Sequence, residues 1–520
     1  MQSFLTQPLH KAVQQCPQAL ALSYGELDFT YAALTDRVAR LASALQTLGM
    51  QAGDRVGMLS FNSHRYVEYF YGVWWGGGAI NPVNIRWNPK EVAFSLDDCD
   101  TRILLVDDTF KAMIPALRDL SKSLQTIVYT GDGEAPEGTV SYEALLAQAA
   151  PVADACRQGD DLAAVLYTGG TTGRPKGVML SHTNLVTSAL GYLLAIPRQP
   201  GTTALVAMPI FHVGGFGHVL QLVLGLHRIV ILPAFEETAV LQAIQQHRAT
   251  EMGLVPIMIK RVVEHPRFAD YDVSSLRLMI YGAAPIDATL LAKALAVLPG
   301  VSFYQGYGMT ECSPIISVLP ANAHLEPHAS AGKLRSAGVP TMQAEVRIVD
   351  GEDRDVARGT VGEIIARGPM VMQGYWNKPE ETVAALRGGW MHTGDSGYMD
   401  EDGFLYTVDR LKDMIITGGE NVYSGEVENA IAQMPEVSMS AVIGIPDEAF
   451  GERVHAVIVL RPGVTLTAQA VTDHCRTLIA GYKCPRSVEF RDQLPLTAAG
   501  KLQKFQLREP FWQGRERRVN

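Results

Sequence analysis

Apolar positions in the first third of the chain alternate between helical and strand-like spacing. Leucines and one valine recur at helical intervals after Thr30, and Gly49 ends the pattern. Short apolar runs predict buried strands, with helices between them, at 55–60, 79–80, 102–106 and 126–129. The same alternation continues through 162–180 and from about 204 to 320. Strands that alternate with helices predict mostly parallel sheets flanked by helices, an α/β fold.

The pattern changes after Gly332. Short strands separated by glycine and acidic turns, at 345–349, 362–367 and 404–408, predict a small β-barrel-like subdomain at about 332–409. The last 110 or so residues form a segment of ordinary domain size, with alternating helix and strand signals of their own. We therefore predict a large N-terminal domain at 1–409 and a small α+β domain at 414–520.

Composition narrows the class of protein. The chain has 520 residues, 47% of them hydrophobic and 19% charged, with a formal charge of −10 and no long basic run, so nucleic acid is not an expected partner. Its six cysteines are scattered without a C-x-x-C pair, and no secretory signal is visible. We expect reduced thiols in a cytoplasmic protein, and no metal bound by cysteine.

One stretch has the length of a membrane span. Residues 199–227 contain no Lys, Arg, Asp or Glu, but they include five glycines, two prolines and three histidines. That composition favours a strand, a turn and a helix in the wall of a buried pocket over a transmembrane helix. Peripheral contact with a membrane surface and a homodimer both stay open.

Glycine, threonine and cationic residues concentrate between Tyr167 and Val178. Glycines let backbone N–H groups turn toward one anion, and hydroxyls and cations add donors and charge. The loop therefore predicts a phosphate site, with binding residues Thr168, Gly169, Gly170, Thr171, Thr172, Gly173 and Lys176. It is not a nucleotide P-loop, because Gly177 rather than Ser or Thr follows the lysine.

A second group of motifs lies between 281 and 311. An adenine ring needs an aromatic face and a closely approaching backbone, which suits Tyr307 with its neighbouring small residues Gly282, Ala283, Ala284 and Gly308. Thr310 offers a hydroxyl to an α-phosphate, and Glu311 offers a hard oxygen ligand to Mg²⁺. Further on, Asp395 follows Thr393-Gly394, where a carboxylate suits the two hydroxyls of a ribose.

These motifs, in this order from about Thr30 to Lys504, resemble the adenylate-forming superfamily of acyl-CoA synthetases, luciferases and peptide-synthetase adenylation domains. The resemblance implies that His212 borders the carboxylate cavity, with Gly214, Gly215 and Gly217 leaving room for an acyl chain. It also implies that Arg410 contacts ribose or phosphate. Lys412 falls at the hinge of a mobile C-terminal domain, within the junction 410–413.

Two further roles follow from the same resemblance. Gly418, Gly419 and Glu420 match the loop that lines the pantetheine tunnel in CoA-using members. Lys501 matches the catalytic lysine, a point charge between the substrate carboxylate and the α-phosphate. The family's catalytic set here would be Lys501, Thr310, Glu311 and His212.

The resemblance implies an acid–thiol ligase that uses ATP, Mg²⁺ and CoA and passes through acyl-AMP. The expected substrate is a medium- or long-chain fatty acid. A 4-coumarate-type aryl-propenoate ligase and a fatty acyl-AMP ligase that loads a carrier protein are the alternatives. A P-loop kinase or GTPase would instead need the Walker pattern, and a binding protein without activity would be expected to have lost Lys501 or Glu311.

Overall fold

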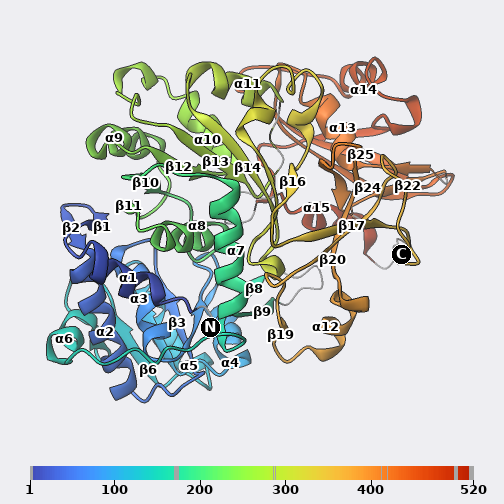
Figure 1. Cartoon of the computed structure of the whole chain (residues 1–520). Coiled ribbons are helices and arrows are strands. Elements are labelled where there is room, and N and C mark those ends of the chain that lie inside the picture. The colour runs from blue at the N-terminus through green and yellow to red at the C-terminus, as the bar shows by residue number, and fades with distance from the viewer. Residues whose placement is uncertain are drawn as a thin grey trace.

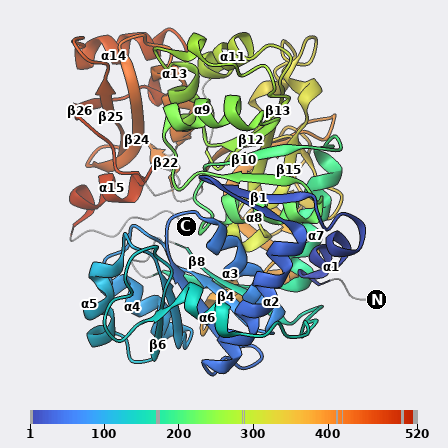
Figure 2. The same cartoon turned by 90° about the vertical axis from the view of Figure 1, so that its left-hand side faces the viewer.

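The computed structural model describes residues 4–168, 175–284, 286, 288–410, 413–418, 420–496 and 502–513. Two large sheets and a small antiparallel sheet make up the N-terminal part, and a further sheet with three helices forms the C-terminal domain. Figure 1 shows this arrangement, and Figure 2 shows the C-terminal domain, in orange and red, as a separate body beside the two large sheets. The predicted α/β class is confirmed.

The first large sheet has eight strands in the order β19-β9-β8-β4-β3-β5-β6-β7. The pairs from β8 to β7 are parallel, whereas β9 runs antiparallel to both β8 and β19. Its strands are β3 (Arg55–Leu59), β4 (Ala79–Pro82), β5 (Ile103–Val106), β6 (Thr126–Tyr129), β7 (Val140–Ser141), β8 (Leu162–Thr168), β9 (Lys176–Ser181) and β19 (Gly374–Tyr375). Helices α4 (Pro89–Asp98) and α5 (Ile114–Leu120) cover one face.

The second large sheet has nine strands in the order β16-β15-β14-β13-β12-β10-β11-β1-β2. Its strands are β1 (Leu20–Tyr24), β2 (Leu27–Thr30), β10 (Thr203–Val206), β11 (Arg228–Ile231), β12 (Glu251–Leu254), β13 (Leu278–Gly282), β14 (Ser302–Gly308), β15 (Ile315–Leu319) and β16 (Val339–Pro340). Its outer face is covered by α9 (Glu237–His247), α10 (Pro256–Val263) and α11 (Ala288–Val297).

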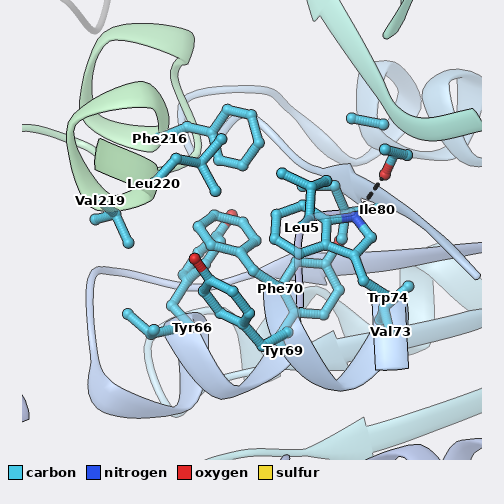
Figure 3. Close-up of a cluster of buried hydrophobic side chains, with 14 of the residues drawn as sticks. Leu5, Tyr66, Tyr69, Phe70, Val73, Trp74, Ile80, Phe216, Val219 and Leu220 are labelled. Atoms are coloured by element: carbon cyan, nitrogen blue, oxygen red, sulfur yellow. Dashed lines mark hydrogen bonds between the residues drawn. The ribbon is translucent and has the colours of Figure 1, made fainter. Parts of the chain in front are cut away.

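The main hydrophobic core lies between the two sheets. Helices α2 (Tyr31–Thr47) and α3 (His64–Trp75) meet α7 (His182–Ala195) and α8 (Val213–Leu224) there. Figure 3 shows Phe216 of α8 facing Phe70 and Trp74 of α3, and the Phe70 and Phe216 ring centroids are 5.0 Å apart in an edge-to-face contact. The Trp74 indole donates to the Ala163 carbonyl at 2.8 Å, which ties α3 to β8.

The sequence patterns predicted the helix after Thr30 and the uncharged stretch correctly. The helix is α2, with Thr30 as its N-cap, whose hydroxyl accepts from the Ala33 N–H. The stretch 199–227 forms β10, a turn and α8, and its helix is mostly buried. No helix among the residues that the structure describes is long and apolar enough to cross a membrane.

The segment predicted to be barrel-like is a four-stranded antiparallel sheet in the order β17-β18-β20-β21. Within the described ranges its two edge strands do not pair with each other, so the sheet is open. Its strands are β17 (Glu345–Val349), β18 (Gly362–Arg367), β20 (Met391–Met399) and β21 (Leu405–Arg410). An isolated bridge from Gly338 to Leu405 joins it to the end of the nine-stranded sheet.

The C-terminal domain has a core of its own. Its strands are β22 (Ile415–Thr417), β23 (Glu420–Val422), β24 (Val437–Asp447), β25 (Gly451–Leu460) and β26 (Ser487–Phe490), and its helices are α13 (Ser424–Ile431), α14 (Ala468–Arg476) and α15 (Lys504–Trp512). Ile415, Val427 and Ile458 are completely buried in that core. A separate core is the condition for this part of the chain to move as one body.

Polar contacts connect α15 to the junction between the domains. The Asp409 carboxylate accepts from the Ser424 hydroxyl at 2.7 Å and from the Ser424 N–H. The Lys504 ammonium lies 2.8 Å from Glu428 and donates to the Ser424 hydroxyl. Burial raises the pKa of the Glu428 carboxyl, against the Lys504 charge. We call these four residues, Asp409, Ser424, Glu428 and Lys504, the junction cluster.

Candidate active site

Three strands from two sheets bring Tyr307, Asp395 and Arg410 together. Tyr307 of β14 donates its phenol to Asp395 Oδ2 at 2.8 Å. Asp395 pairs with Arg410 across β20 and β21, and the Arg410 Nε lies 3.5 Å from Asp395 Oδ1. Burial, and after it the Asp395 charge, raises the pKa of the Tyr307 phenol well above its usual value, so the phenol remains a donor. These residues, predicted separately for adenine, ribose and phosphate, therefore form one cluster.

The small residues predicted at the adenine site are also needed by the strands themselves. A Cβ on Gly282 would lie 2.4 Å from the Gly306 carbonyl oxygen on β14, and one on Gly308 would lie 1.9 Å from the Pro314 carbonyl oxygen. Ala283, directly after β13, has φ +66°, a left-handed conformation that is uncommon outside glycine. The backbone is thus closely packed where Gly282 of β13 pairs with Gly306 of β14 and at Gly308, the neighbour of Tyr307 in the chain.

A second cluster centres on Glu311, in the short helix Thr310–Cys312 that follows β14. Glu311 is buried, and its Oε1 accepts from the Tyr375 phenol at 2.9 Å. Because Mg²⁺ is usually held by one or two carboxylates together with phosphate oxygens, a single buried carboxylate at this position fits that ion. Among the described residues no group of three or more His, Cys, Asp or Glu side chains could hold a metal by itself.

The two ends of the phosphate loop face each other in the sheet. Thr168 at the end of β8 pairs with Lys176 at the start of β9. The Lys176 ammonium lies 5.0 Å from the centre of the Tyr375 ring and forms an ion pair with Glu381 of α12 (Pro379–Ala385). Lys176 and Glu311 therefore both contact Tyr375, Lys176 over its ring and Glu311 at its hydroxyl. Gly169, Gly170, Thr171, Thr172 and Gly173 lie outside the described residues.

The residues assigned to the thiol half-reaction are described only in part. Gly418 has φ +61°, and its N–H donates to the Phe450 carbonyl at 2.8 Å, while Glu420 is exposed at the start of β23. Gly419, Lys412 and Lys501 lie outside the described residues. The ends of the Lys501 loop are nevertheless fixed, because Leu496 and Leu502 form an antiparallel bridge.

His212 is the N-cap residue of α8, and the glycines behind it have different surroundings. A Cβ on Gly214 would meet nothing within 4 Å, in agreement with an open acyl site. On Gly215 it would lie 2.3 Å from the Pro209 carbonyl oxygen, and on Gly217 it would lie 2.9 Å from the Pro314 ring. The expectation that all three glycines leave room for an acyl chain is therefore wrong for Gly215 and Gly217, which permit close packing.

Sequence reasoning missed Tyr375 and Glu381. Both approach the site because β19 pairs with β9, which joins Tyr375 to Val178 nearly 200 residues earlier. An apolar pattern signals strands, but the partner of a two-residue strand has no signal in a single sequence. The run Gln373-Gly374-Tyr375 carries no motif that marks the tyrosine as a partner of Glu311.

Lys176 is predicted to bind phosphate and is paired with Glu381, so removing the Glu381 charge is expected to strengthen ATP binding. The Lys176 hydrogen bond lowers the pKa of Glu381, so the carboxylate is charged near neutral pH. Glu381→Gln should lower the KM for ATP by about two- to fivefold, the range of a partly exposed ion pair. Lys176→Ala should raise it. The neighbouring variant Glu380→Gln serves as the control in steady-state assays, and an unchanged KM in Glu381→Gln would show that the pair does not compete with ATP.

Comparison with known proteins agrees with this geometry. A family model described as AMP-binding enzyme matches residues 9–376, and one described as AMP-binding enzyme C-terminal domain matches residues 426–501. Feruloyl-CoA synthase from Amycolatopsis sp is 38% identical over 97% of this chain and 98% of its own. The long-chain-fatty-acid–CoA ligase of Bacillus subtilis is 32% identical over 98% of this chain and 94% of its own.

A solved structure covers nearly the whole fold. ATP-bound MatB from Rhodopseudomonas palustris superposes with a TM-score of 0.89 at 32% identity, over 98% of this chain and 99% of that one. Both domains of the fold are thus matched together. The chain belongs to the AMP-binding enzymes of the adenylate-forming superfamily, and it is an ATP-dependent, AMP-forming acid–CoA ligase.

Proposed function

We propose that this ligase acts on a compact carboxylic acid of the aryl-propenoate type, with a medium- or long-chain fatty acid as the second candidate. One observation supports the compact acid above all: one helical turn beyond the open side of Gly214, α8 carries the buried His218, which lies 2.9 Å from Glu251. A long alkyl chain that continued along this face would meet the His218 ring with hydrocarbon alone, which cannot satisfy the unpaired Nδ1. An aromatic ring ends before that point.

The relatives include ligases for both candidate acids, and they differ in sequence identity to this chain. The feruloyl-CoA synthase, named for an aryl-propenoate thioester, is 38% identical, and the fatty-acid ligase of Bacillus subtilis is 32% identical. Aryl and alkyl ligases share the nucleotide motifs, so the identity over the whole chain says less about the acid than the residues around α8 do. The choice therefore rests on His218 and its neighbours.

In the first half-reaction a carboxylate oxygen attacks the α-phosphorus of ATP, and pyrophosphate leaves. The carboxylate is a poor electrophile, and its conversion to acyl-AMP gives it a good leaving group. The work of the chain is to orient the two anions and to neutralise their charge. We assign the phosphates to Thr168, Lys176 and Thr310, the ribose to Asp395, and the α-phosphate and carboxylate to Lys501. Mg²⁺ bound at Glu311 would supply additional positive charge.

In the second half-reaction the CoA thiol attacks the acyl carbon, a tetrahedral carbon forms, and AMP leaves. No side chain has to become covalently attached in either step. The Gly418–Glu420 loop is assigned to the pantetheine arm, since a slender thiol chain passes only where side chains are small. The Gly418 N–H that donates to Phe450 holds one end of this loop in place.

The function is tested by the identity of the products. With ATP and an aryl-propenoate, the enzyme is expected to release AMP and pyrophosphate, and CoA should be consumed in equal amount. ADP as the product would refute the ligase chemistry. A panel with 3-phenylpropenoate, hexanoate and palmitate separates the two substrate classes: a higher kcat/KM for palmitate would favour the fatty acid.

Lys412→Pro is expected to separate the two half-reactions. Lys501 and the Gly418–Glu420 loop belong to one domain but serve different steps, so that domain has to rotate, with the φ/ψ change near Lys412. Proline fixes φ near about −65° and restricts the residue before it. Pyrophosphate release should survive, while CoA-dependent turnover falls at least about tenfold, a barrier change of roughly 1.4 kcal/mol. Timing both products in one mutant is the measurement. Wild-type rates for both would contradict the hinge.

A further inference from the structure

A charged cluster lies under α8 that the nucleotide chemistry does not use. Glu251, the first residue of β12, is bound by the Arg198 guanidinium through two contacts of 2.7 and 2.8 Å and by His218 Nε2 at 2.9 Å. The three side chains are 2%, 1% and 4% exposed for Arg198, Glu251 and His218. Arg198 also donates to the Gln221 amide oxygen at 3.2 Å. We call these residues, Arg198, Glu251, His218 and Gln221, the α8 polar cluster.

The contacts assign which nitrogen carries the proton in the neutral form of the histidine. Burial alone would raise the pKa of Glu251, but the Arg198 charge and the hydrogen bonds from His218 and Arg198 lower it to about 2. An ionised carboxylate can only accept hydrogen bonds, so the proton of the imidazole is on Nε2. In the neutral ring, Nδ1 is then an acceptor. This atom is buried and has no hydrogen-bond partner among the described residues.

A glycine lies beside this buried acceptor. A Cβ on Gly253 of β12 would lie 3.1 Å from His218 Nδ1 and 2.9 Å from the Met208 methyl carbon, so a larger side chain at this position would crowd that nitrogen. Met208 begins the segment that leads to His212. The unpaired nitrogen therefore lies next to a backbone position without a side chain, on the side of α8 that adjoins the acyl segment. An unpaired buried acceptor is costly unless a ligand satisfies it.

Helix α8 separates the His218 acceptor from His212, the residue assigned to the carboxylate of the acid, by about the length of an aryl-propenoate. Gly214 and His218 are four residues apart and so lie on the same face of α8. His212 and Gly214 are partly exposed, whereas His218 is buried, so the face leads inward from the open end. Six residues of helix from His212 to His218 span about 9 Å. A benzene ring with a propenoate arm is of comparable length.

We propose that His218, held by Glu251 and Arg198, accepts a hydrogen bond from a hydroxyl at the far end of the acid, so that the enzyme selects 4-hydroxyaryl acids over acids without that donor. The inference rests on the proposed acid–CoA ligase function and names its substrate class. Glu251 and Arg198 are positioning residues, because they act through His218. The selected feature is an O–H or N–H donor opposite the carboxylate, carried by a ring rather than by a long alkyl chain.

The test compares three acids of matched shape in the wild-type enzyme: 3-(4-hydroxyphenyl)propenoate, its 4-fluoro analogue, which cannot donate, and the unsubstituted 3-phenylpropenoate. We expect kcat/KM for the hydroxy acid to exceed that for the fluoro acid at least about tenfold, as for one well-made hydrogen bond whose loss leaves a buried acceptor unpaired. Equal values for the two acids, with AMP released from both, would overturn the role of His218 and leave the ligase function intact. AMP release from none of a broad panel of acids would instead refute the ligase function.

Two variants assign the preference to the nitrogen. His218→Phe keeps a ring but removes the acceptor, and the hydroxy-to-fluoro ratio of kcat/KM should fall to within about threefold. His218→Asn presents an amide oxygen close to the Nδ1 position and should restore part of the ratio. Because the ratio is taken within one variant, a general loss of stability does not change it. A hydroxy-to-fluoro ratio that stays at the wild-type value in His218→Phe would show that another group binds the hydroxyl.

Discussion

Lys501→Ala is expected to slow acyl-AMP formation about a thousandfold, the upper range for the loss of one charged group aimed at a transition state. The lysine is assigned to the attacking carboxylate and the α-phosphate, where negative charge accumulates during the first half-reaction. The second half-reaction contains no attacking carboxylate. The rate of thioester formation from supplied acyl-AMP should therefore remain within about threefold of wild type, because the Lys501 charge contributes little to the transition state of this step.

The two steps are measured separately. Pyrophosphate release in the absence of CoA reports the first, and thioester formation from synthetic acyl-AMP reports the second. Lys501→Arg is the matched variant: it keeps the charge but spreads it over a planar group, so only part of the rate should return. Lys122→Ala, which removes an exposed lysine of the N-terminal domain, controls for charge alone. Equal loss of both steps in Lys501→Ala would indicate damage to the fold and contradict the assignment.

Glu251→Met is expected to lower the free energy of unfolding by about 3–5 kcal/mol, the cost of leaving one member of a buried ion pair without its partner. Arg198 is only 2% exposed, and among the described residues its ion pair is with Glu251, so the variant leaves its charge buried without that partner. The double variant Arg198→Met, Glu251→Met should recover most of the loss, because it removes the buried charge as well as its partner.

Urea unfolding, followed by the fluorescence of the buried tryptophans, measures this free energy. Trp74 is buried in the core between the two sheets, so its signal reports the N-terminal domain. Glu345→Met is the control, since the Arg367–Glu345 pair has a similar distance of 2.6 Å but both side chains are more than half exposed. That variant should change stability by less than about 1 kcal/mol. Additive losses in the double variant would show that Arg198 and Glu251 do not depend on each other.

Local patterns predicted the elements of this fold well. The helix after Thr30 and the strand and helix within 199–227 form as expected, because apolar spacing and glycine or threonine ends are local properties. The motif Thr393-Gly394-Asp395 pointed to Asp395 and the resemblance to a family supplied Arg410, and the structure brings the two into register on β20 and β21. Residues whose role depends on motif order were therefore within reach of sequence reasoning.

Contacts between distant segments were not predicted. Tyr375 reaches Glu311 through a two-residue strand. A Cβ on Gly215 would lie 2.3 Å from the Pro209 carbonyl oxygen, so close backbone packing rather than an acyl chain requires that glycine. Lone buried histidines are usually core residues, so His218 had no signal of its own until Glu251 and Arg198 were found beside it. These contacts depend on which strands pair in the sheets, and the pattern of a single sequence does not specify that pairing.

The junction cluster bears on the proposed rotation of the C-terminal domain. Asp409 precedes the proposed pivot at Lys412, while Ser424, Glu428 and Lys504 follow it, so the Asp409–Ser424 hydrogen bonds cross the pivot. If the domain has two orientations, these hydrogen bonds stabilise the described one relative to any orientation that separates Asp409 from Ser424. A substrate or intermediate shifts the equilibrium between the two orientations only by the difference in its affinity for them. A ligand that favours another orientation of the C-terminal domain therefore has to supply more free energy than these two hydrogen bonds contribute to the described one.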